Sequence, residues 1–489
     1  MELSKLLEGV DHFKKSDFNP DVTFLTCNSK EVKKGSVFAA LKGVNFDGHN
    51  FVKKALEYGA CAVLVEKDLN IENQIIVENA HKAYSKMCAN FLDNPAKNLK
   101  FIGVTGTNGK TTVTNIVKNI LAREGKKIGL IGTIQNEIGS EVIPTEKTTP
   151  NPMDFQKLIK NMLNKNCEYV VMEVSSHALA QHRIADTNFE IAIFTNLSQD
   201  HLDYHKTMED YFNAKKMLFN VAKKGIVFID DEYGEKLINN APCEMYTFSI
   251  KNKKANFLAQ NIELTSNYVK YNITGEDINT EIVFNTPGLF SVYNSMAAFI
   301  CCKLLGLNYA NIAKAIKHCE PIKGRSEVIK TYEDFNIICD YAHSPDGLKN
   351  ILDSIKSYKK GRIITLFGCG GDRDKKKRPI MGEIAAKNSD FLIVTSDNPR
   401  TEQPAKIIED ILIGVKKTNT PYVKILNRKK AIQYAIKNAK KNDIILLAGK
   451  GHETYQIIGT TKIKLDEREI VGKALADLKK EKDIENYKN

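Results

Sequence analysis

The sequence contains no apolar segment long enough to cross a membrane. None of its stretches approaches the ~20 consecutive apolar residues that a membrane-spanning helix requires. No long apolar run follows residues 1–5 either, so no secretory signal peptide is expected. We therefore expect a chain without a membrane span that works in the cytoplasm.

Cysteine pairs with the spacing of metal or redox sites are also missing. The ten cysteines include no Cys-x-x-Cys pair. Cys301 and Cys302 are adjacent, which suits neither a disulfide framework nor a zinc site. Reduced thiols in a cytosol are the simplest interpretation.

Sequence features of nucleic-acid binding are absent as well. The net charge is +12, but the lysines are spread along the chain and no basic motif is interleaved with aromatic residues. A solvated, lysine-rich surface is therefore expected rather than a nucleic-acid groove. Small phosphorylated or carboxylated molecules would suit the positive field, so the expected partners are small-molecule substrates, and the chain is expected to be a monomer.

Strand and helix patterns divide the chain into three parts, as its length of 489 residues predicts. Residues 1–98 carry short apolar strands, and residues 99–325 alternate apolar strands with helical patterns. In residues 326–489, apolar strands repeatedly end in polar loops that contain glycine or proline. The expected fold is α/β, with a small N-terminal α/β domain, a central P-loop domain with a parallel sheet, and a C-terminal Rossmann-like domain.

A glycine-rich turn between an apolar strand and a helix is the most informative motif. Residues 105–112 read Thr-Gly-Thr-Asn-Gly-Lys-Thr-Thr and follow the apolar residues 101–104. Backbone N–H groups at a helix start hold phosphate, Lys110 would add a charge, and Thr111 would place its hydroxyl on Mg²⁺. Val104 stands where the usual P-loop pattern has glycine, so an ordinary strand-to-helix turn is the alternative.

Three residues outside the P-loop are candidates for metal chemistry. Glu173 ends an apolar run, and His201 follows another, where a carboxylate or imidazole could bind Mg²⁺. Lys215 falls inside the apolar stripe of a predicted helix that starts after Thr207, and a lysine on a buried face is costly unless it is paired or modified. A solvated strand end, a structural histidine and a snorkelling lysine are the respective alternatives.

Jointly, these motifs resemble those of the Mur ligase family over essentially the whole chain. Two further motifs of the family are matched only in part: its Asp-Ser-Arg is Asn28-Ser29-Lys30 here, and its Asn-x-Tyr-Asn is Ser291-Val292-Tyr293-Asn294. The matching segments, in family order, are residues 105–112, 148–150, 173–177, 195–205, 211–219, 340–346, 368–373, 397–400 and 449–453.

The resemblance implies a role for each matching residue. It implies that residues 1–98 bind the UDP-substrate, that residues 99–325 bind ATP, and that residues 326–489 bind the incoming amino acid. It implies catalytic roles for Lys110, His201 and Lys215, and a second Mg²⁺ bound by Glu173, His201 and Lys215 as a carbamate. The implied ATP contacts are Gly106, Thr107, Asn108, Gly109, Lys110, Thr111, Thr112, Asn294, Arg325 and Asp340. The implied UDP-muramoyl-dipeptide contacts are Ser29, Thr148, Thr149, Ser175, Gln181 and Arg183. The implied diaminopimelate contacts are Arg373, Asp397, Asn398, Pro399, Arg400, Gly449 and Glu453.

The implied activity is an ATP-dependent ligase that adds meso-diaminopimelate to UDP-N-acetylmuramoyl-L-alanyl-D-glutamate through an acyl phosphate. Arg400 is the residue expected to select the amine, because a guanidinium can hold the second carboxylate of meso-diaminopimelate, which lysine lacks. The same ligase adding L-lysine, and a folate-polyglutamate-type ligase, remain alternatives. A P-loop switch or motor would explain residues 101–125, but neither Lys215 nor the C-terminal loops. A non-catalytic nucleotide-binding protein is a third class.

Overall fold

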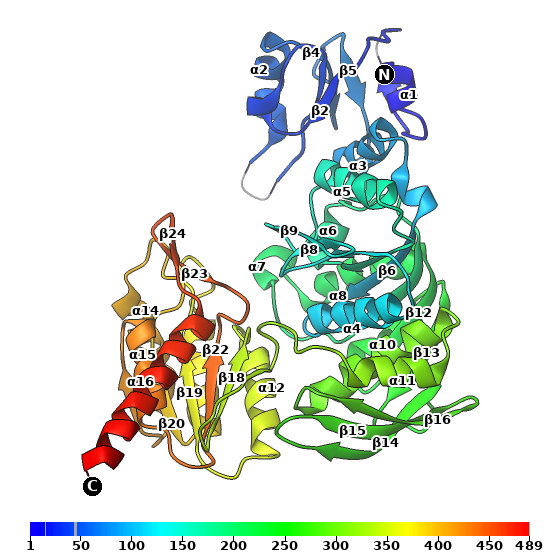
Figure 1. Ribbon diagram of the computed structural model, residues 1–489. Helices are drawn as coiled ribbons and strands as arrows, with labels where there is room; N and C mark the ends of the chain where they lie inside the picture. The colour runs from blue at the N-terminus through cyan, green and yellow to red at the C-terminus, as the bar shows by residue number, and fades with distance from the viewer. Residues whose placement is uncertain (15, 44–45, 489) are drawn as a thin grey trace. The chain divides into compact units, whose positions relative to one another are not determined.

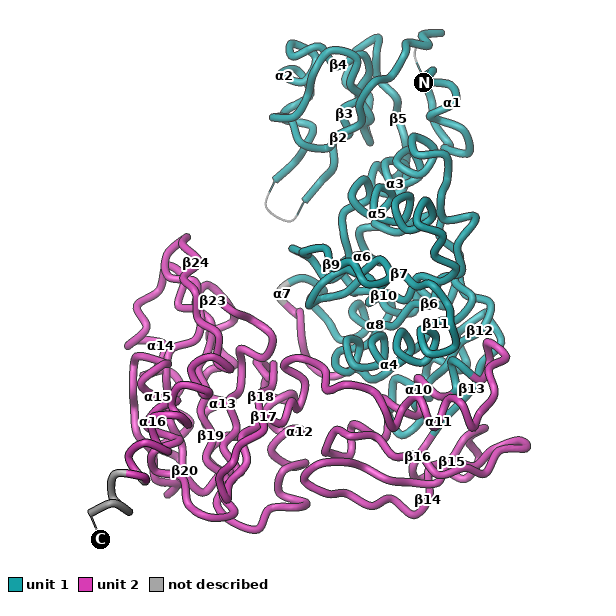
Figure 2. Tube along the Cα trace, viewed as in Figure 1, with its two compact units in different colours: residues 1–197, 204–248, 300–302 teal, residues 198–203, 249–299, 303–489 magenta. Residues whose placement is uncertain are grey.

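The computed structural model describes residues 1–14, 16–43 and 46–488. It divides into two compact units, which have different colours in Figure 2. The first unit comprises residues 1–197, 204–248 and 300–302, and the second comprises residues 198–203, 249–299 and 303–489. Within the described residues, no helix combines the length and the apolar character that a membrane crossing needs.

The N-terminal part of the first unit is a small sheet with helices on both faces. Its strand order is β1-β5-β4-β3-β2, and every neighbouring pair is parallel except β1 and β5. In β3, Val37 packs into one apolar cluster while the next residue, Phe38, packs into another on the opposite face. A strand buried on both faces explains the continuous apolar run. The elements are α1 (Leu3–Leu6), β1 (Phe13–Lys14), β2 (Phe24–Thr26), β3 (Ser36–Ala39), α2 (Val52–Glu57), β4 (Ala60–Val65), β5 (Gln74–Ile76) and α3 (Ala80–Phe91).

The P-loop strand lies in the middle of the larger sheet of the first unit. In this unit the strands follow the order β13-β12-β11-β6-β10-β7-β8-β9, and β13 to β7 are parallel. These strands are β6 (Lys100–Thr105), β7 (Ile128–Ile131), β8 (Asn136–Ile138), β9 (Glu141–Ile143), β10 (Tyr169–Glu173), β11 (Phe189–Phe194), β12 (Ala222–Phe228) and β13 (Glu244–Ser249). The helices of this part include α4 (Lys110–Arg123), α5 (Pro152–Asn164), α6 (Ser176–Ala180) and α8 (Met208–Lys216).

The second unit contains an antiparallel meander and a separate C-terminal sheet. The meander joins β14 (Phe257–Leu264), β15 (Val269–Gly275) and β16 (Ile278–Phe284), and the helices α10 (Leu289–Leu304) and α11 (Tyr309–Lys317) follow it along the chain. The C-terminal sheet has the order β17-β18-β22-β19-β20-β21, and all its pairs are parallel except β17 with β18. Its strands are β17 (Glu327–Ile329), β18 (Asn336–Asp340), β19 (Ile363–Phe367), β20 (Phe391–Val394), β21 (Tyr422–Lys424) and β22 (Ile444–Ala448).

Helices cover both faces of the C-terminal sheet, as a Rossmann-like fold requires. One apolar cluster contains residues of α12 (Pro345–Lys356), α13 (Lys377–Asn388) and α14 (Pro404–Val415). The other contains residues of α15 (Arg428–Lys437) and α16 (Glu467–Lys488). A hairpin of β23 (Tyr455–Ile458) and β24 (Thr461–Lys464) follows β22 (Figure 1).

The predicted α/β class and the parallel P-loop sheet are confirmed, but the middle of the chain is not wholly parallel. The hairpin strands β8 and β9 pair antiparallel beside β7, and β14, β15 and β16 form an antiparallel meander. The sequence prediction missed these strands because their apolar runs are short or interrupted by polar residues, and periodicity alone does not give the pairing partner.

Candidate active site

The P-loop is held in place by the end of the neighbouring strand. Gly106 has φ +146°, and a Cβ there would lie 1.9 Å from Thr195 Oγ1, so only glycine fits. Thr195 Oγ1 donates to Asn108 O at 2.6 Å, and Asn108 N donates to Asn196 Oδ1 at 3.0 Å. Gly109, with φ +87°, then starts α4 at Lys110. The turn is therefore shaped by tertiary contacts as well as by its own glycines.

Two lysine ammonium groups converge on one carbonyl of this loop. Lys110 Nζ donates to Gly106 O at 2.9 Å and to Thr107 O at 2.8 Å. Lys215 Nζ donates to the same Gly106 O at 2.8 Å. Positive charge is thus concentrated where a P-loop binds phosphate.

The sequence prediction that Lys215 faces inward is confirmed. Lys215 is 1% exposed on α8, whose first turn is capped by Thr207 Oγ1 accepting from Asp210 N. Its Nζ lies 4.5 Å from the ring centroid of Tyr211, whose hydroxyl is 3.2 Å from Thr107 Oγ1. The snorkelling alternative is wrong, because the ammonium group lies inside the protein.

Glu173 lies at the carboxyl end of β10 and contacts the P-loop threonine. Thr111 Oγ1 donates to Glu173 Oε1 at 3.0 Å, and the carboxylate is buried at 1% exposure. Thr133, which the sequence prediction did not include, donates to the same carboxylate through its N–H and its hydroxyl, both at 2.8 Å. Oxygen donors of this kind fit Mg²⁺.

His201, the remaining predicted metal ligand, belongs to the second unit, in the segment 198–203. Its side chain is 45% exposed, and its Nε2 lies 3.5 Å from Asp200 Oδ2. Its backbone has φ +54° and its N–H donates to Asp200 Oδ1 at 2.9 Å. The first unit groups Thr111, Glu173 and Lys215 around the P-loop, and the role of His201 stays a prediction.

Most of the predicted UDP-muramoyl-dipeptide contacts form one hydrogen-bonded group. Thr149 Oγ1 donates to Glu173 O at 2.9 Å and accepts from Ser175 N at 3.0 Å. Arg183 donates to Thr149 O at 3.0 Å and to Gln181 Oε1 at 2.9 Å, and burial lowers the pKa of this guanidinium. The group is therefore hydrogen-bonded to the carboxyl end of β10, where Glu173 lies.

Two further members of this predicted set lie beside the group or elsewhere in the first unit. Thr148 Oγ1 lies 3.0 Å from Thr133 Oγ1, next to the Glu173 carboxylate. Ser29 is half-buried in the N-terminal sheet region, in a short helix that Asn28 caps. Neither contact identifies a ligand, so both roles stay predictions.

The predicted nucleotide contacts Asn294, Arg325 and Asp340 all lie in the second unit. Asn294 is buried in α10, and the Arg325 guanidinium lies 4.7 Å from the ring centroid of Tyr341. Asp340 accepts hydrogen bonds from Ser326 N at 2.7 Å and from Ala342 N at 2.8 Å, and burial raises the pKa of its carboxyl group. Their role as nucleotide contacts stays a prediction.

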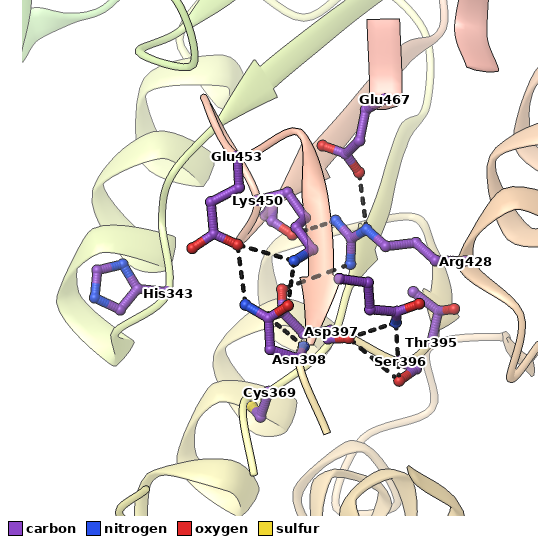
Figure 3. Close-up of polar contacts among 12 residues, drawn as sticks. His343, Cys369, Thr395, Ser396, Asp397, Asn398, Arg428, Lys450, Glu453 and Glu467 are labelled. Carbon is purple, nitrogen blue, oxygen red and sulfur yellow. Dashed lines mark hydrogen bonds and ion pairs between the residues drawn. The ribbon is translucent and has the colours of Figure 1, made fainter. Parts of the chain in front are cut away.

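The loops after β18, β19, β20 and β22 share one edge of the C-terminal sheet, as the sequence predicted. The four strands are neighbours in parallel register, so their carboxyl ends meet. At this edge, Asn398 Nδ2 donates to Glu453 Oε2 at 2.9 Å. Gly449 has φ +107°, and a Cβ there would lie 3.0 Å from Asp397 Oδ2. Figure 3 shows Asp397 beside Asn398. Open α/β sheets bind ligands at such an edge.

Lys450 is a buried residue of this site that the sequence prediction missed. It lies within the selected segment 449–453, it is 0% exposed, and its ammonium forms an ion pair with Glu453 at 2.8 Å. The flanking glycines let the backbone turn there, but they do not indicate burial of the lysine between them, so the sequence carried no signal for it.

A second buried cation, Arg428 on α15, lies beneath Asp397. Its Nε donates to Glu467 Oε1 at 2.8 Å, its Nη2 donates to Ala448 O at 2.8 Å, and its Nη1 lies 4.0 Å from Asp397 Oδ2. Both Arg428 and Glu467 have side chains 0% exposed. The pair ties α15 and α16 to the end of β22 and provides a positive charge below the loop.

The two predicted arginines of the amine site differ in their surroundings. Arg400 is half-buried with φ +51°, and its Nη1 donates to Gly371 O at 2.8 Å. Arg373 is exposed and donates only to the neighbouring Asp372 O, at 3.0 Å, among the described contacts. Pro399, between Asn398 and Arg400, has no backbone N–H, so it cannot donate a hydrogen bond in this turn.

Three family descriptions match successive parts of the chain. Residues 21–96 match the Mur ligase family, catalytic domain. Residues 104–302 match the Mur ligase middle domain. Residues 324–451 match the Mur ligase, glutamate ligase domain.

Similar proteins cover the same full length. A protein of Caldanaerobacter subterraneus subsp. tengcongensis named UDP-N-acetylmuramoyl-L-alanyl-D-glutamate--2,6-diaminopimelate ligase is 48% identical over 98% of this chain and 100% of its own length. A Clostridioides difficile protein of the same name is 42% identical over the same shares.

Solved structures agree with this similarity. A structure titled as a UDP-N-acetylmuramoyl-L-alanyl-D-glutamate--2,6-diaminopimelate ligase has a TM-score of 0.71 at 29% identity and covers 97% of this chain and 99% of its own. MurF ligase from Thermotoga maritima in complex with ADP shares the fold, with a TM-score of 0.60 at 20% identity over 93% of this chain and 98% of its own.

Proposed function

The chain belongs to the Mur ligase family, and we propose that it is the ATP-dependent ligase that adds meso-diaminopimelate to UDP-N-acetylmuramoyl-L-alanyl-D-glutamate in peptidoglycan synthesis. The observation that carries the proposal is the grouping of Lys110, Lys215 and Glu173 around one P-loop. It occurs in a chain whose relatives, over their full length, are named for this reaction. A switch or motor has no use for a second lysine, buried on α8, at the P-loop.

The reaction forms an amide bond in two steps. The D-glutamate side-chain carboxylate attacks the γ-phosphorus of ATP, the bond to the ADP oxygen breaks, and an acyl phosphate forms. The amine then attacks the acyl carbon, loses a proton, and the tetrahedral intermediate expels inorganic phosphate. Lys110 stabilises the negative charge of the transferring phosphoryl group, and the protein otherwise acts by positioning its substrates.

Thr111 and Glu173 are the residues we propose to hold Mg²⁺, together with His201 and modified Lys215. When bound, Mg²⁺ would neutralise charge on the phosphates. Their support is the oxygen-rich donor set at the end of β10, where Thr111 and Glu173 are already in contact at 3.0 Å.

Carbamylation of Lys215 is part of this proposal. The lysine ammonium first loses a proton. The neutral amine then adds to CO₂ and releases a second proton, so that a cation becomes an anion that can bind metal. The carbamate keeps one N–H, so the hydrogen bond to Gly106 O at 2.8 Å can persist after modification. The change would also remove the repulsion between the two cations that share this carbonyl.

The remaining site residues keep their predicted roles within this proposal. Thr148, Thr149, Ser175, Gln181 and Arg183, with Ser29, would bind the UDP-substrate. The ATP contacts would be completed by Asn294, Arg325 and Asp340, and residues 326–489 would deliver the amine. We also propose a monomer that works in the cytoplasm, where ten free cysteines would stay reduced.

The test is an ADP-release assay with UDP-N-acetylmuramoyl-L-alanyl-D-glutamate and a panel of amines. The expected result is ADP release that depends on both the UDP-substrate and meso-diaminopimelate. Release with L-lysine alone would assign the lysine-adding reaction, and release with a folate and glutamate would assign the folate reaction. Amine-independent ATP hydrolysis would indicate a switch or motor.

A further inference from the structure

Lys450 uses all three of its ammonium hydrogens inside the protein. Its Nζ donates to Asn398 Oδ1 and to Glu453 Oε2 at 2.8 Å (Figure 3). It also donates to Tyr455 O at 2.7 Å. An ammonium group has three donors and no acceptor, so these contacts saturate it. Because the side chain is also 0% exposed, Lys450 cannot contact a ligand and must act through its neighbours.

The first neighbour is Asn398, whose amide is oriented by these contacts. Asn398 Oδ1 accepts from Lys450 Nζ and from Ile457 N at 2.9 Å, which occupies both of its lone pairs. Both donors identify this atom as oxygen, so Nδ2 points the other way, where it donates to Glu453 Oε2 at 2.9 Å. One Nδ2 hydrogen remains for an acceptor such as a ligand carboxylate.

The second neighbour is Glu453, whose two carboxylate oxygens differ. Oε2 accepts from both Lys450 and Asn398, whereas Oε1 has no hydrogen-bond partner among the described residues. With Oε2 held in this way, Oε1 is the oxygen left to accept from an ammonium group. Lys450 therefore orients one donor, Asn398 Nδ2, and one acceptor, Glu453 Oε1, for a ligand.

The charges around this pair favour a cationic ligand group. The buried cluster contains two cations, Lys450 and Arg428, and three carboxylates, Asp397, Glu453 and Glu467. Its net charge is one negative charge when all five groups are ionised. Asp397 Oδ2 is buried and accepts no hydrogen bond from the part of the chain that the structure describes. A desolvated ammonium would therefore be attracted to this site.

We propose that Lys450 is a positioning residue of the amine site, which fixes Asn398 and Glu453 in the arrangement that recognises the incoming amino acid. This inference rests on the proposed function and deepens it. The hairpin β23–β24 takes part, because Tyr455 O binds Lys450 and Ile457 N binds Asn398. Without the Lys450 cation, Glu453 and Asn398 lose their shared partner and can rotate.

The experiment compares Lys450→Met with Lys462→Met, a matched control on the exposed strand of the same hairpin. For Lys450→Met we expect the KM for meso-diaminopimelate to rise about ten- to hundredfold, since hydrogen bonds to charged groups are lost. We expect KM for ATP and for the UDP-substrate to stay within about twofold, and Lys462→Met to match the wild type. An unchanged diaminopimelate KM in folded Lys450→Met would overturn the proposal, as would an equal rise of all three KM values.

A second variant keeps the test decisive if Lys450→Met does not fold. In Lys450→Met/Glu453→Gln, no buried carboxylate is left without its cation, so the fold is expected to recover. The diaminopimelate KM should be higher than in Glu453→Gln alone, because Asn398 has also lost Lys450, and equal KM values in these two variants would overturn the positioning role. Failure of the wild type to use diaminopimelate at all would instead contradict the proposed function, so the two failures are distinguishable.

Discussion

Lys110 and Lys215 donate to the same backbone oxygen, Gly106 O, at 2.9 and 2.8 Å. The two residues reach it from different helices, α4 and α8, and Lys215 is 1% exposed. Two cations on one carbonyl repel each other in a buried environment unless an anion separates them or one of them loses its charge. A phosphate on the P-loop and a carbamate on Lys215 would each relieve this repulsion.

Lys110→Ala is expected to remove activity without unfolding the protein. Because Lys110 supplies charge to the phosphates, the loss of kcat should be about a hundredfold or more. The measurement is amine-dependent ADP release, with thermal unfolding as the check on folding. Lys126→Ala, in the loop after α4, is the control and should keep its activity. Near-normal turnover by folded Lys110→Ala would contradict the role of Lys110 in stabilising the phosphates.

Lys215→Ala is expected to be inactive and to be partly rescued by a short carboxylate such as acetate. The added carboxylate would occupy the space of the missing carbamate and restore its negative charge. Activity is measured against acetate concentration at low Mg²⁺. Lys216→Ala, the neighbour outside the buried stripe, should behave like the wild type without acetate. High activity of Lys215→Ala at low Mg²⁺ would exclude the carbamate role.

Arg400→Ala is expected to narrow the preference for meso-diaminopimelate over lysine. A desolvated guanidinium without its carboxylate costs roughly 2–5 kcal/mol, so the wild type should disfavour lysine by about a thousandfold. Alanine keeps a Cβ, so the strain of φ +51° is unchanged by the substitution. The measurement is kcat/KM for both amines in both proteins, with KM for ATP as the control. An unchanged ratio would show that Arg400 is not the selector.

His452 is expected to make the protein sensitive to acid. Burial, and then the nearby charges of Arg325 and Arg468, lower the pKa of His452 to about 3. An unfolded imidazole has a pKa of about 6.5, so between pH 6.5 and 3 the unfolded chain binds a proton that the folded chain does not. Stability is therefore complete above pH 6.5 and falls as the pH is lowered, by about 2 kcal/mol at pH 5.

Thermal unfolding of His452→Gln between pH 7.5 and pH 5 tests this expectation. The variant should lose less stability on acidification than the wild type, because glutamine does not titrate. His12→Gln, at an exposed position of the first unit, is the control and should follow the wild-type curve. Parallel pH curves for the wild type and His452→Gln would contradict the lowered pKa of His452.

Local patterns in the sequence predicted much of the fold and some of the site. The apolar run before Gly106 and the stripe of α4 predicted the P-loop, and the same periodicity placed Lys215 on a buried face, as the structure confirms. These predictions succeeded because periodicity reports which face of an element is buried. The boundaries at residues 98 and 325 stay predictions.

Contacts between distant segments could not be predicted in the same way. Thr133 binds Glu173 from a position 40 residues away, and Lys450 binds Asn398 from 52 residues away. Neither Thr133 nor Lys450 stands out by residue type, and a lysine between two glycines more often lies on the surface. Only the packed sheet brings such residues together.

By itself, the sequence determined the strand, turn and helix of the P-loop and the set of polar strand ends, because each depends on neighbouring residues. The tertiary structure decided which of these strand ends share an edge, that Lys110 and Lys215 meet at Gly106 O, and that Lys450 is saturated by Asn398, Glu453 and Tyr455. The physical reason is that a buried charge requires partners, and the partners here are supplied by strands and loops far apart in the chain.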